Sequence, residues 1–207
     1  MVNLKRTPPF VRLTLKIMGN AKGAVLKHFK EYVIALHGED GWLKLVGFLS
    51  DEERMTLTLN PDEQKWYPML LLKRLIGAFD SLYGNNGQFA SIVPIAEHIA
   101  ENDIIPFLER FTNLQSPSAV VRNTPSLWKR YFDSGEIKID DVDDAGKHYS
   151  FFLENFESVS GMIFCTELVS TWLRRILAHS GAEEIDITHS DFAEANGSPA
   201  TLDVSWS

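Results

Sequence analysis

Residues 160–207 read SGMIFCTELVSTWLRRILAHSGAEEIDITHSDFAEANGSPATLDVSWS, and the spacing of their apolar residues changes partway along. From Met162 to Leu177 apolar residues recur about every 3.6 positions, which predicts one amphipathic helix. Gly181 can take the left-handed conformation that ends a helix, so we expect this helix to end near Ser180. The apolar stripe along it must be covered by another element.

Beyond this helix, apolar and polar residues alternate as they do along a strand. Residues 185–190 and 201–206 each present one apolar and one polar face. Residues 196–199, Asn-Gly-Ser-Pro, supply turn residues between them. We therefore expect an antiparallel hairpin with one face toward the preceding helix.

The first half of the chain has helical patterns. Residues 20–114 carry apolar stripes for about six helices, the last two over residues 89–101 and 103–111. Gly38 is expected to close the first helix, Ser50 to begin a later one through a capping box with Glu53, and Pro68 to open the most apolar one.

Strand patterns follow. Residues 115–125 mix Ser, Pro and Asn, which predicts a connection. Residues 127–132, 136–142 and 147–154 predict a meander of three strands. With the terminal hairpin this gives an α+β fold: a helical N-terminal half of about six helices, then an antiparallel sheet of about five strands, with a long helix before the hairpin.

We expect a single domain over residues 1–207, because 207 residues with 44% hydrophobic content suffice for one core. Its parts are an N-terminal arm or edge strand at 1–19, a helical half at 20–114, and the sheet plus long helix at 125–207. The edge strand is suggested by the alternation over Phe10–Ile17.

Composition excludes several classes of protein. The only cysteine is Cys165, so an internal disulfide is excluded and a reducing, cytoplasmic location is expected. No apolar run approaches the roughly 18 residues that cross a bilayer, so membrane insertion is not expected. The net charge of −8 argues against nucleic acid. Seven Lys or Arg residues precede the first acidic residue, Glu31, and this basic segment suits either an acidic partner or the acidic remainder of the chain.

No motif supports catalysis, a cofactor or a metal ion. The six histidines form no HxH or HExxH pair, and no glycine-rich phosphate loop is present. Asp140, Asp141, Asp143 and Asp144 lack the calcium-loop pattern and read as a solvated turn. We therefore predict that the protein is not an enzyme and name no catalytic, cofactor-binding or metal-ligating residue.

Aromatic residues supply the candidate ligand site. Trp128, Tyr131 and Phe132 share one predicted strand, while Cys165 and Trp172 lie on the long helix expected to face it. These five residues line a predicted apolar pocket between helix and sheet. Ordinary core packing is the alternative, because large aromatics fill cores in general and a free cysteine behaves as a small hydrophobe.

Several short motifs resemble a known group of proteins. Together they resemble an uncharacterised paralogous family abundant in myxobacteria. The order of elements is more distantly similar to the superfamily of four-vinyl-reductase domains, heme-nitric-oxide-binding domains and vesicle-tethering TRAPP subunits. The motifs are Gly38-Glu39-Asp40-Gly41-Trp42, Trp66-Tyr67-Pro68, Pro125-Ser126-Leu127-Trp128 with Tyr131 and Gly135, Gly161 through Trp172-Leu173 with Gly181, and Val204-Ser205-Trp206.

The resemblance implies a small-molecule-binding or interaction domain, often dimeric. Heme binders of this superfamily carry Tyr-x-Ser-x-Arg, which no tyrosine here begins, so heme is not expected although His98 lies on a suitable helix. Related four-vinyl-reductase domains often carry cysteines where this chain has Phe192 and Thr201. We predict a non-enzymatic cytoplasmic sensory or adaptor domain that binds a small apolar molecule and acts through a protein partner or a homodimer. The alternative is a purely structural interaction module without ligand.

Overall fold

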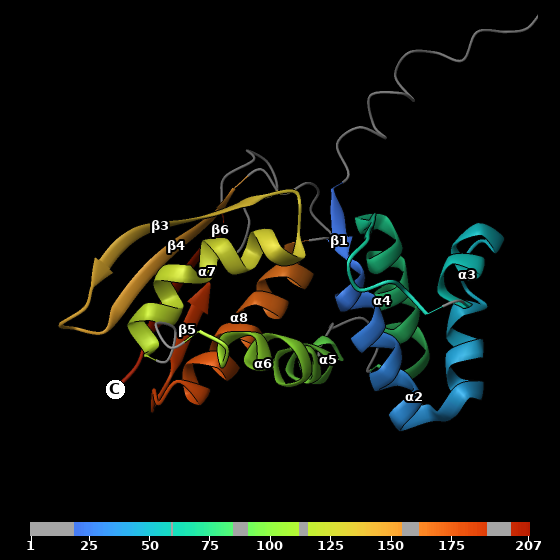
Figure 1. Ribbon diagram of the computed structural model, residues 1–207, viewed down its shortest axis with the longest axis horizontal. Helices are drawn as coiled ribbons and strands as arrows, with labels where there is room; N and C mark the ends of the chain where they lie inside the picture. Colours follow the sequence, from blue (N-terminus) through green and yellow to red (C-terminus); the bar gives the residue numbers. More distant parts are fainter. Residues whose placement is uncertain (1–18, 59, 85–90, 112–115, 155–161, 190–199) are drawn as a thin grey trace, which may run out of the picture.

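Two lobes lie side by side in the computed structural model, one built of helices and one containing a sheet (Figure 1). We call residues 19–84 the N-terminal lobe and residues 91–207 the C-terminal lobe. The expected edge strand over Phe10–Ile17 lies outside the described residues. The structure describes residues 19–58, 60–84, 91–111, 116–154, 162–189 and 200–207.

The N-terminal lobe contains three helices and a small two-stranded sheet. The helices are α2 (Gly23–Val46), α3 (Asp51–Thr58) and α4 (Met69–Tyr83), and they confirm the helical prediction for this part. The strands β1 (Asn20–Lys22) and β2 (Trp66–Pro68) pair antiparallel. β1 leads directly into α2, and β2 leads directly into α4. These two helices pack on each other.

Two helix boundaries in this lobe are the predicted ones. Gly38 has φ 71° and ψ 177°, and it breaks α2 into two helical segments. Only glycine adopts such a conformation without strain, which is why the first apolar stripe stops there. At the start of α3, the Glu53 amide donates to Ser50 Oγ at 3.3 Å and the Ser50 amide donates to Glu53 Oε2 at 3.0 Å. These two bonds form the expected capping box.

Ser50→Ala is expected to lower the free energy of unfolding by about 1 kcal/mol, because the Glu53 amide loses its acceptor. Ser81→Ala is the matched control: the Ser81 hydroxyl is exposed and donates to the Gly77 carbonyl within α4, so its removal should change stability by less than about 0.5 kcal/mol. Urea denaturation of both variants measures the difference, and equal losses would contradict the capping role.

The next helical segment differs from the prediction in one respect. Two separate helices were expected, over 89–101 and 103–111. Instead α5 (Ile92–Ile99) continues through a π-helical turn, η1 (Ala100–Ile104), into α6 (Ile105–Leu108). Pro106 lacks the amide that would bond back along an α-helix, and the wider turn that precedes it absorbs this mismatch.

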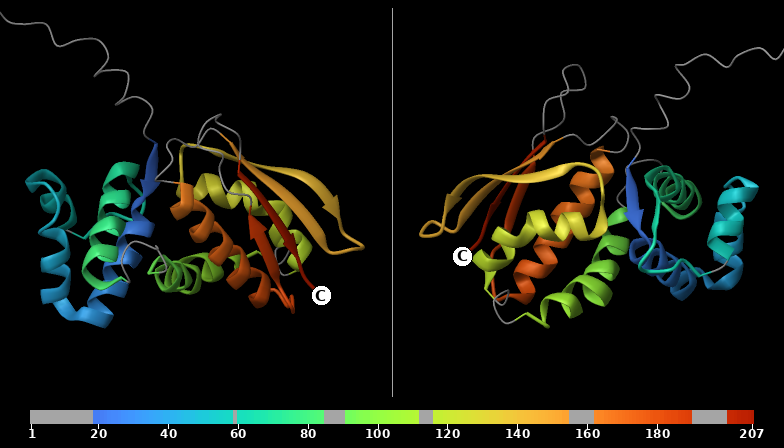
Figure 2. Two further views of the ribbon diagram at one scale, coloured as in Figure 1. Left: turned by 180° about the vertical axis from the view of Figure 1, so that it is seen from behind. Right: turned by 45° about the horizontal axis from the view of Figure 1, so that its top comes forward.

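Besides α5, η1 and α6, the C-terminal lobe contains a four-stranded antiparallel sheet with α7 and α8 against one face (Figure 2). The strand order is β3-β4-β6-β5, so the last strand of the chain lies inside the sheet. α7 contacts β3 and α8, and α8 contacts β5 and β6. The elements are α7 (Pro117–Tyr131), β3 (Glu136–Asp143), β4 (His148–Glu154), α8 (Met162–His179), β5 (Asp186–His189) and β6 (Ala200–Ser205).

The prediction of a strand over residues 127–132 and of a connection over 115–125 is wrong, because α7 spans nearly all of both segments. Ser116 caps α7 by accepting from the Ala119 amide at 3.3 Å. The buried residues of α7 recur at helical spacing, so packing on one face outweighs the strand preference of the aromatics. These buried residues are Val120, Val121, Thr124, Leu127, Trp128 and Tyr131.

The predicted long helix and the pairing of the two strands after it are confirmed, while the expected turn at residues 196–199 lies outside the described residues. α8 ends at His179, and Gly181 has φ 95°. β5 and β6 pair antiparallel, with Ile187 opposite Val204. The α+β class is therefore as expected, with one strand fewer in the main sheet of the described chain.

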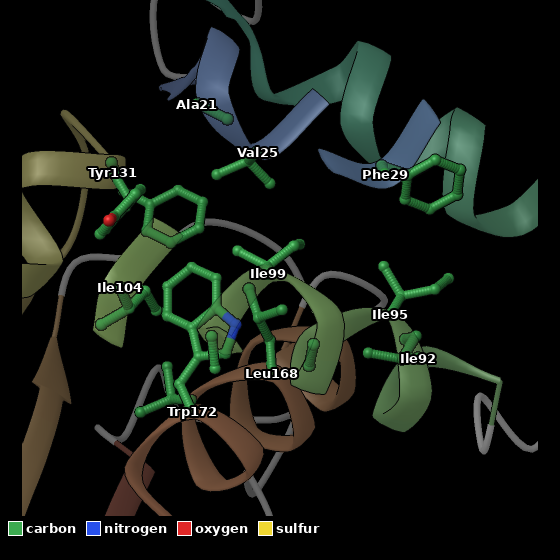
Figure 3. Packing of buried hydrophobic residues seen from close by; sticks show 14 of the residues in the cluster. Ala21, Val25, Phe29, Ile92, Ile95, Ile99, Ile104, Tyr131, Leu168 and Trp172 are labelled. Carbon is green, nitrogen blue, oxygen red and sulfur yellow. The ribbon is translucent and has the colours of Figure 1, made fainter. Parts of the chain in front are cut away.

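The lobes are joined at β1. Ala21 forms an antiparallel bridge with Phe132, the first residue after α7. The Asp133 amide donates to the Asn20 carbonyl at 3.2 Å, and Asn20 Nδ2 donates to Asp133 Oδ2 at 2.6 Å. The core runs across this junction, where α2, α5 and α8 meet (Figure 3). None of the helices in the described ranges has the length and apolar character required to cross a membrane.

Candidate functional site

The four predicted pocket residues whose side chains are described form one aromatic cluster. Trp128 and Phe132 stand at the end of α7 with ring centroids 4.4 Å apart. Trp172 of α8 stacks on Phe132 at 5.9 Å and meets Tyr131 edge-on at 5.3 Å. The fifth predicted residue, Cys165, lies in α8, but its side chain is outside the described part. All four rings are buried, so the cluster is also part of the core.

A small apolar cavity of about 20 Å³ lies beside this cluster, between α7, α8 and β3. That volume holds about one water-sized molecule, yet the lining offers no polar surface to hold a water. Such a cavity is expected to stay dry. Its lining residues are Ile104, Thr124, Leu127, Trp128, Ile137, Val169, Trp172, Leu173 and Ile176.

Trp172 brings an unused hydrogen-bond donor to this region. Its side chain is 6% exposed, and within the described ranges its Nε1 has no hydrogen-bond partner. Figure 3 shows the indole nitrogen directed into the apolar interior on the side of Ile99 and Leu168. A buried indole N–H normally finds an acceptor, so this donor is an unsatisfied polar group within the apolar core.

Tyr131 belongs to a second, more polar arrangement on the other side of the cluster. Its hydroxyl accepts from Arg130 Nε at 3.2 Å, and Arg130 lies 3.9 Å from Asp103. Burial, together with the charge of Asp103, raises the pKa of Tyr131 well above its ordinary value, and Arg130 opposes the shift. Tyr131 therefore keeps its hydroxyl proton at physiological pH.

A second cavity, of about 10 Å³, lies between the lobes. It is lined only by apolar residues from α2, α4, α5 and α8. Figure 3 shows several of them closing on one another across the junction. The lining comprises Val25, Phe29, Leu72, Ile76, Ile92, Ile95, Ile99 and Leu168.

Histidines gather where α2 meets α5. His28 Nδ1 is 2.8 Å from Glu31 Oε2, and the His28 and His98 ring centroids are 6.2 Å apart. The Tyr32 ring lies 5.6 Å from that of His98. Asn102 Nδ2 is 3.2 Å from His98 Nδ1, while His98 Nε2 is buried with no partner among the described residues. Sequence reasoning missed this cluster; its one local signal is the spacing of three between His28 and Glu31 on a helix.

Because of the His98 ring, the free energy of unfolding is expected to decrease as the pH drops below 6.5. Burial, and secondly the charge of His28, lower its pKa from the ordinary 6.5, while Glu31 opposes the shift. Below pH 6.5 the His98 ring then binds a proton in the unfolded chain but not in the folded chain. The contribution of the neutral ring to the free energy of unfolding is therefore complete above pH 6.5 and is lost as the pH falls toward the folded-state pKa. Denaturation midpoints at pH 8.0 and 5.5 in chelator check this. The wild type should lose more stability than His98→Gln, and equal losses would contradict it.

The chain is similar in structure to several H-NOX proteins. The Fe(II) unliganded H-NOX protein of K. algicida is 11% identical, with a TM-score of 0.67 over 90% of this chain and 96% of that one. The H-NOX protein of S. oneidensis in the Fe(II)NO state is 13% identical, with a TM-score of 0.65 over 90% and 99%. The sequence matches no family model and no curated protein. The chain therefore shares the fold of these H-NOX proteins; membership of the superfamily and the myxobacterial resemblance stay predictions.

The packing between the lobes does not fit a heme. Pockets that enclose ligands of drug size have volumes of about 300–1,000 Å³. The two cavities described here measure about 20 and 10 Å³. His98 stands on a helix facing the other lobe, but its ring packs against His28 and Tyr32 rather than against open space. The sequence also lacks Tyr-x-Ser-x-Arg, so no step proposed below uses heme.

Proposed function

We propose that this protein is a non-enzymatic cytoplasmic sensory domain that binds a small apolar molecule in the cavity between α7, α8 and β3. The observation that carries the proposal is the apolar cavity of about 20 Å³ that Trp128 and Trp172 line. An apolar cavity receives a small apolar molecule at little desolvation cost.

The five residues predicted from sequence keep this proposed role. Trp128 and Trp172 line the cavity. Tyr131 and Phe132 both contact the Trp172 ring, and Phe132 also contacts Trp128. Cys165 stays a predicted neighbour. We propose that occupancy of the cavity changes how α7 and α8 pack and that a protein partner or a second copy of the chain reads this change.

Xenon binding tests the cavity in the full chain. In ¹H–¹⁵N spectra the five tryptophans give five indole signals, and Trp172→Phe identifies that of Trp172. Saturating xenon should shift this signal the most. Val169→Ile, which adds a methylene beside the cavity, should weaken the shift, whereas Val25→Ile, which adds one beside the smaller cavity, should not.

Two results would overturn the proposal: no shift of the Trp172 signal, or equal shifts in the two isoleucine variants. Native mass spectrometry of protein purified from its own cells then identifies the natural ligand as a retained mass. Sedimentation velocity with and without that ligand tests whether a dimer forms or dissociates on binding.

A structural interaction module is the second candidate, and exposed apolar side chains favour it. Four large apolar side chains lie on the second half of α2, in the loop after it and on α3, and each is 58 to 73% exposed. A partner that docked here would cover them. Leu43→Glu with Met55→Glu should then abolish partner capture without changing the melting temperature. Unaltered capture would refute this candidate. The four residues are Leu36, Leu43, Phe48 and Met55.

A further inference from the structure

Three metal-ligating side chains, His28, Glu31 and His98, converge where α2 meets α5. One nitrogen of each histidine and one oxygen of Glu31 lie within 4.8 Å of one another. In a tetrahedral zinc site with bonds of about 2.0–2.1 Å, neighbouring ligand atoms are about 3.3 Å apart. Small side-chain rotations would therefore place all three atoms around one ion.

One ring nitrogen of His98 has no hydrogen-bond partner in the described part of the chain. Its Nε2 is buried and makes no hydrogen bond to any described residue. Leaving a buried polar atom unsatisfied costs free energy, which a coordinated ion would recover.

We propose that His28, Glu31 and His98 bind a divalent first-row transition metal ion and leave at least one coordination position open. Two imidazoles and one carboxylate form the donor set of open zinc and non-heme iron sites. The ion would join α2 of the N-terminal lobe to α5 of the C-terminal lobe. This site is distinct from the cavity beside Trp172, so either proposal can fail without the other.

The surroundings suit such a site. A metal bound at His98 Nε2 leaves the ring proton on Nδ1, which then needs an acceptor. Asn102 Nδ2 lies 3.2 Å from Nδ1 and donates to the His98 carbonyl at 2.8 Å, so this amide must turn away from the carbonyl before its oxygen can accept from Nδ1. Lys27 Nζ lies 3.6 Å from Glu31 Oε1 and also pairs with Glu63, so its contact with Glu31 can be given up when that carboxylate binds an ion. Glu31 is half-exposed, which gives an ion a route from solvent.

Metal titration of the full chain tests the proposal. The protein is stripped with chelator and titrated with Zn²⁺ by calorimetry and with Co²⁺ by visible absorption. We expect one ion per chain and a Co²⁺ spectrum with imidazole ligands. Glu31→Gln and His98→Gln should each weaken binding at least about tenfold, since loss of even an outer-shell partner costs ~10–100-fold. Zn²⁺ should raise the melting temperature of the wild type and not of these variants.

His179→Gln is the matched control, because His179 Nε2 also pairs with a glutamate, Glu109, at 3.3 Å on the surface. This variant should bind Zn²⁺ like the wild type. Absence of saturable binding, or equal affinity in all three variants and the wild type, would overturn the proposal. Glu31→Gln keeps the shape of a half-exposed side chain, so a melting curve without metal shows that any lost binding is not lost folding.

Discussion

Trp172→Ala is expected to lower the free energy of unfolding by about 3–5 kcal/mol. The indole is 6% exposed and lies between α7 and α8. Its removal takes away the ring that Tyr131 and Phe132 contact and enlarges a cavity already present. Guanidinium denaturation followed by circular dichroism measures the loss.

Trp66→Ala provides the comparison for this prediction. Trp66 is 41% exposed on β2 and is contacted by the Lys22 ammonium 4.3 Å from its ring centre. Its truncation should cost no more than about 1 kcal/mol. Trp172→Phe keeps an aromatic ring and removes an N–H without a partner in the described structure, so it should cost less than the alanine. Similar losses for the two tryptophan truncations would show that Trp172 is not a core residue.

Gly23→Ala is expected to lower the free energy of unfolding by about 1–3 kcal/mol or more. A Cβ at this first residue of α2 would lie 2.0 Å from the Asp62 carbonyl oxygen and 2.8 Å from the Tyr67 ring. The Gly23 amide also donates to the Lys65 carbonyl at 2.8 Å, which holds the two backbones together. The added methyl group therefore displaces backbone, and thermal unfolding should report it.

Gly77→Ala should have the opposite sign. Gly77 lies inside α4, and a Cβ there meets nothing within 4 Å. Because alanine favours the helix over glycine by about 0.5–1 kcal/mol, this variant should be more stable than the wild type. If Gly23→Ala raised stability as Gly77→Ala is expected to, the close approach of Asp62 to Gly23 would be wrong.

The elements predicted correctly are those whose signals are local. Gly38 and Gly181 end helical stripes, and both have positive φ values. Ser50 and Glu53 form their capping box within four residues of sequence. In each case neighbouring residues alone determine the conformation, so the sequence suffices.

α7 was missed because its local signals conflict. Residues 117–126 contain two prolines, serines and asparagine, and residues 127–132 are rich in aromatics. Propensity alone then favours a loop and a strand. The stripe from Val120 to Tyr131 has helical spacing, and burial of that face against α8 and β3 decides the outcome.

The two candidate sites were predictable to different degrees. Trp128 and Trp172 were expected to face each other, and both line the cavity although the secondary structure expected for Trp128 was wrong. The meeting of His98 with His28 and Glu31 depends on the packing of α2 against α5. No short motif encodes that packing.

The bridge between Ala21 and Phe132 constrains how the protein can be recombined. A gene fragment that ends after α4 encodes Ala21 of β1 but lacks Phe132, with which Ala21 forms the bridge. A fragment that begins at α5 encodes Phe132 but lacks β1. Chimeras of related chains with a crossover between the lobes should therefore express poorly unless both sides of this bridge come from one parent. The described lobes are expected to be inherited as one unit.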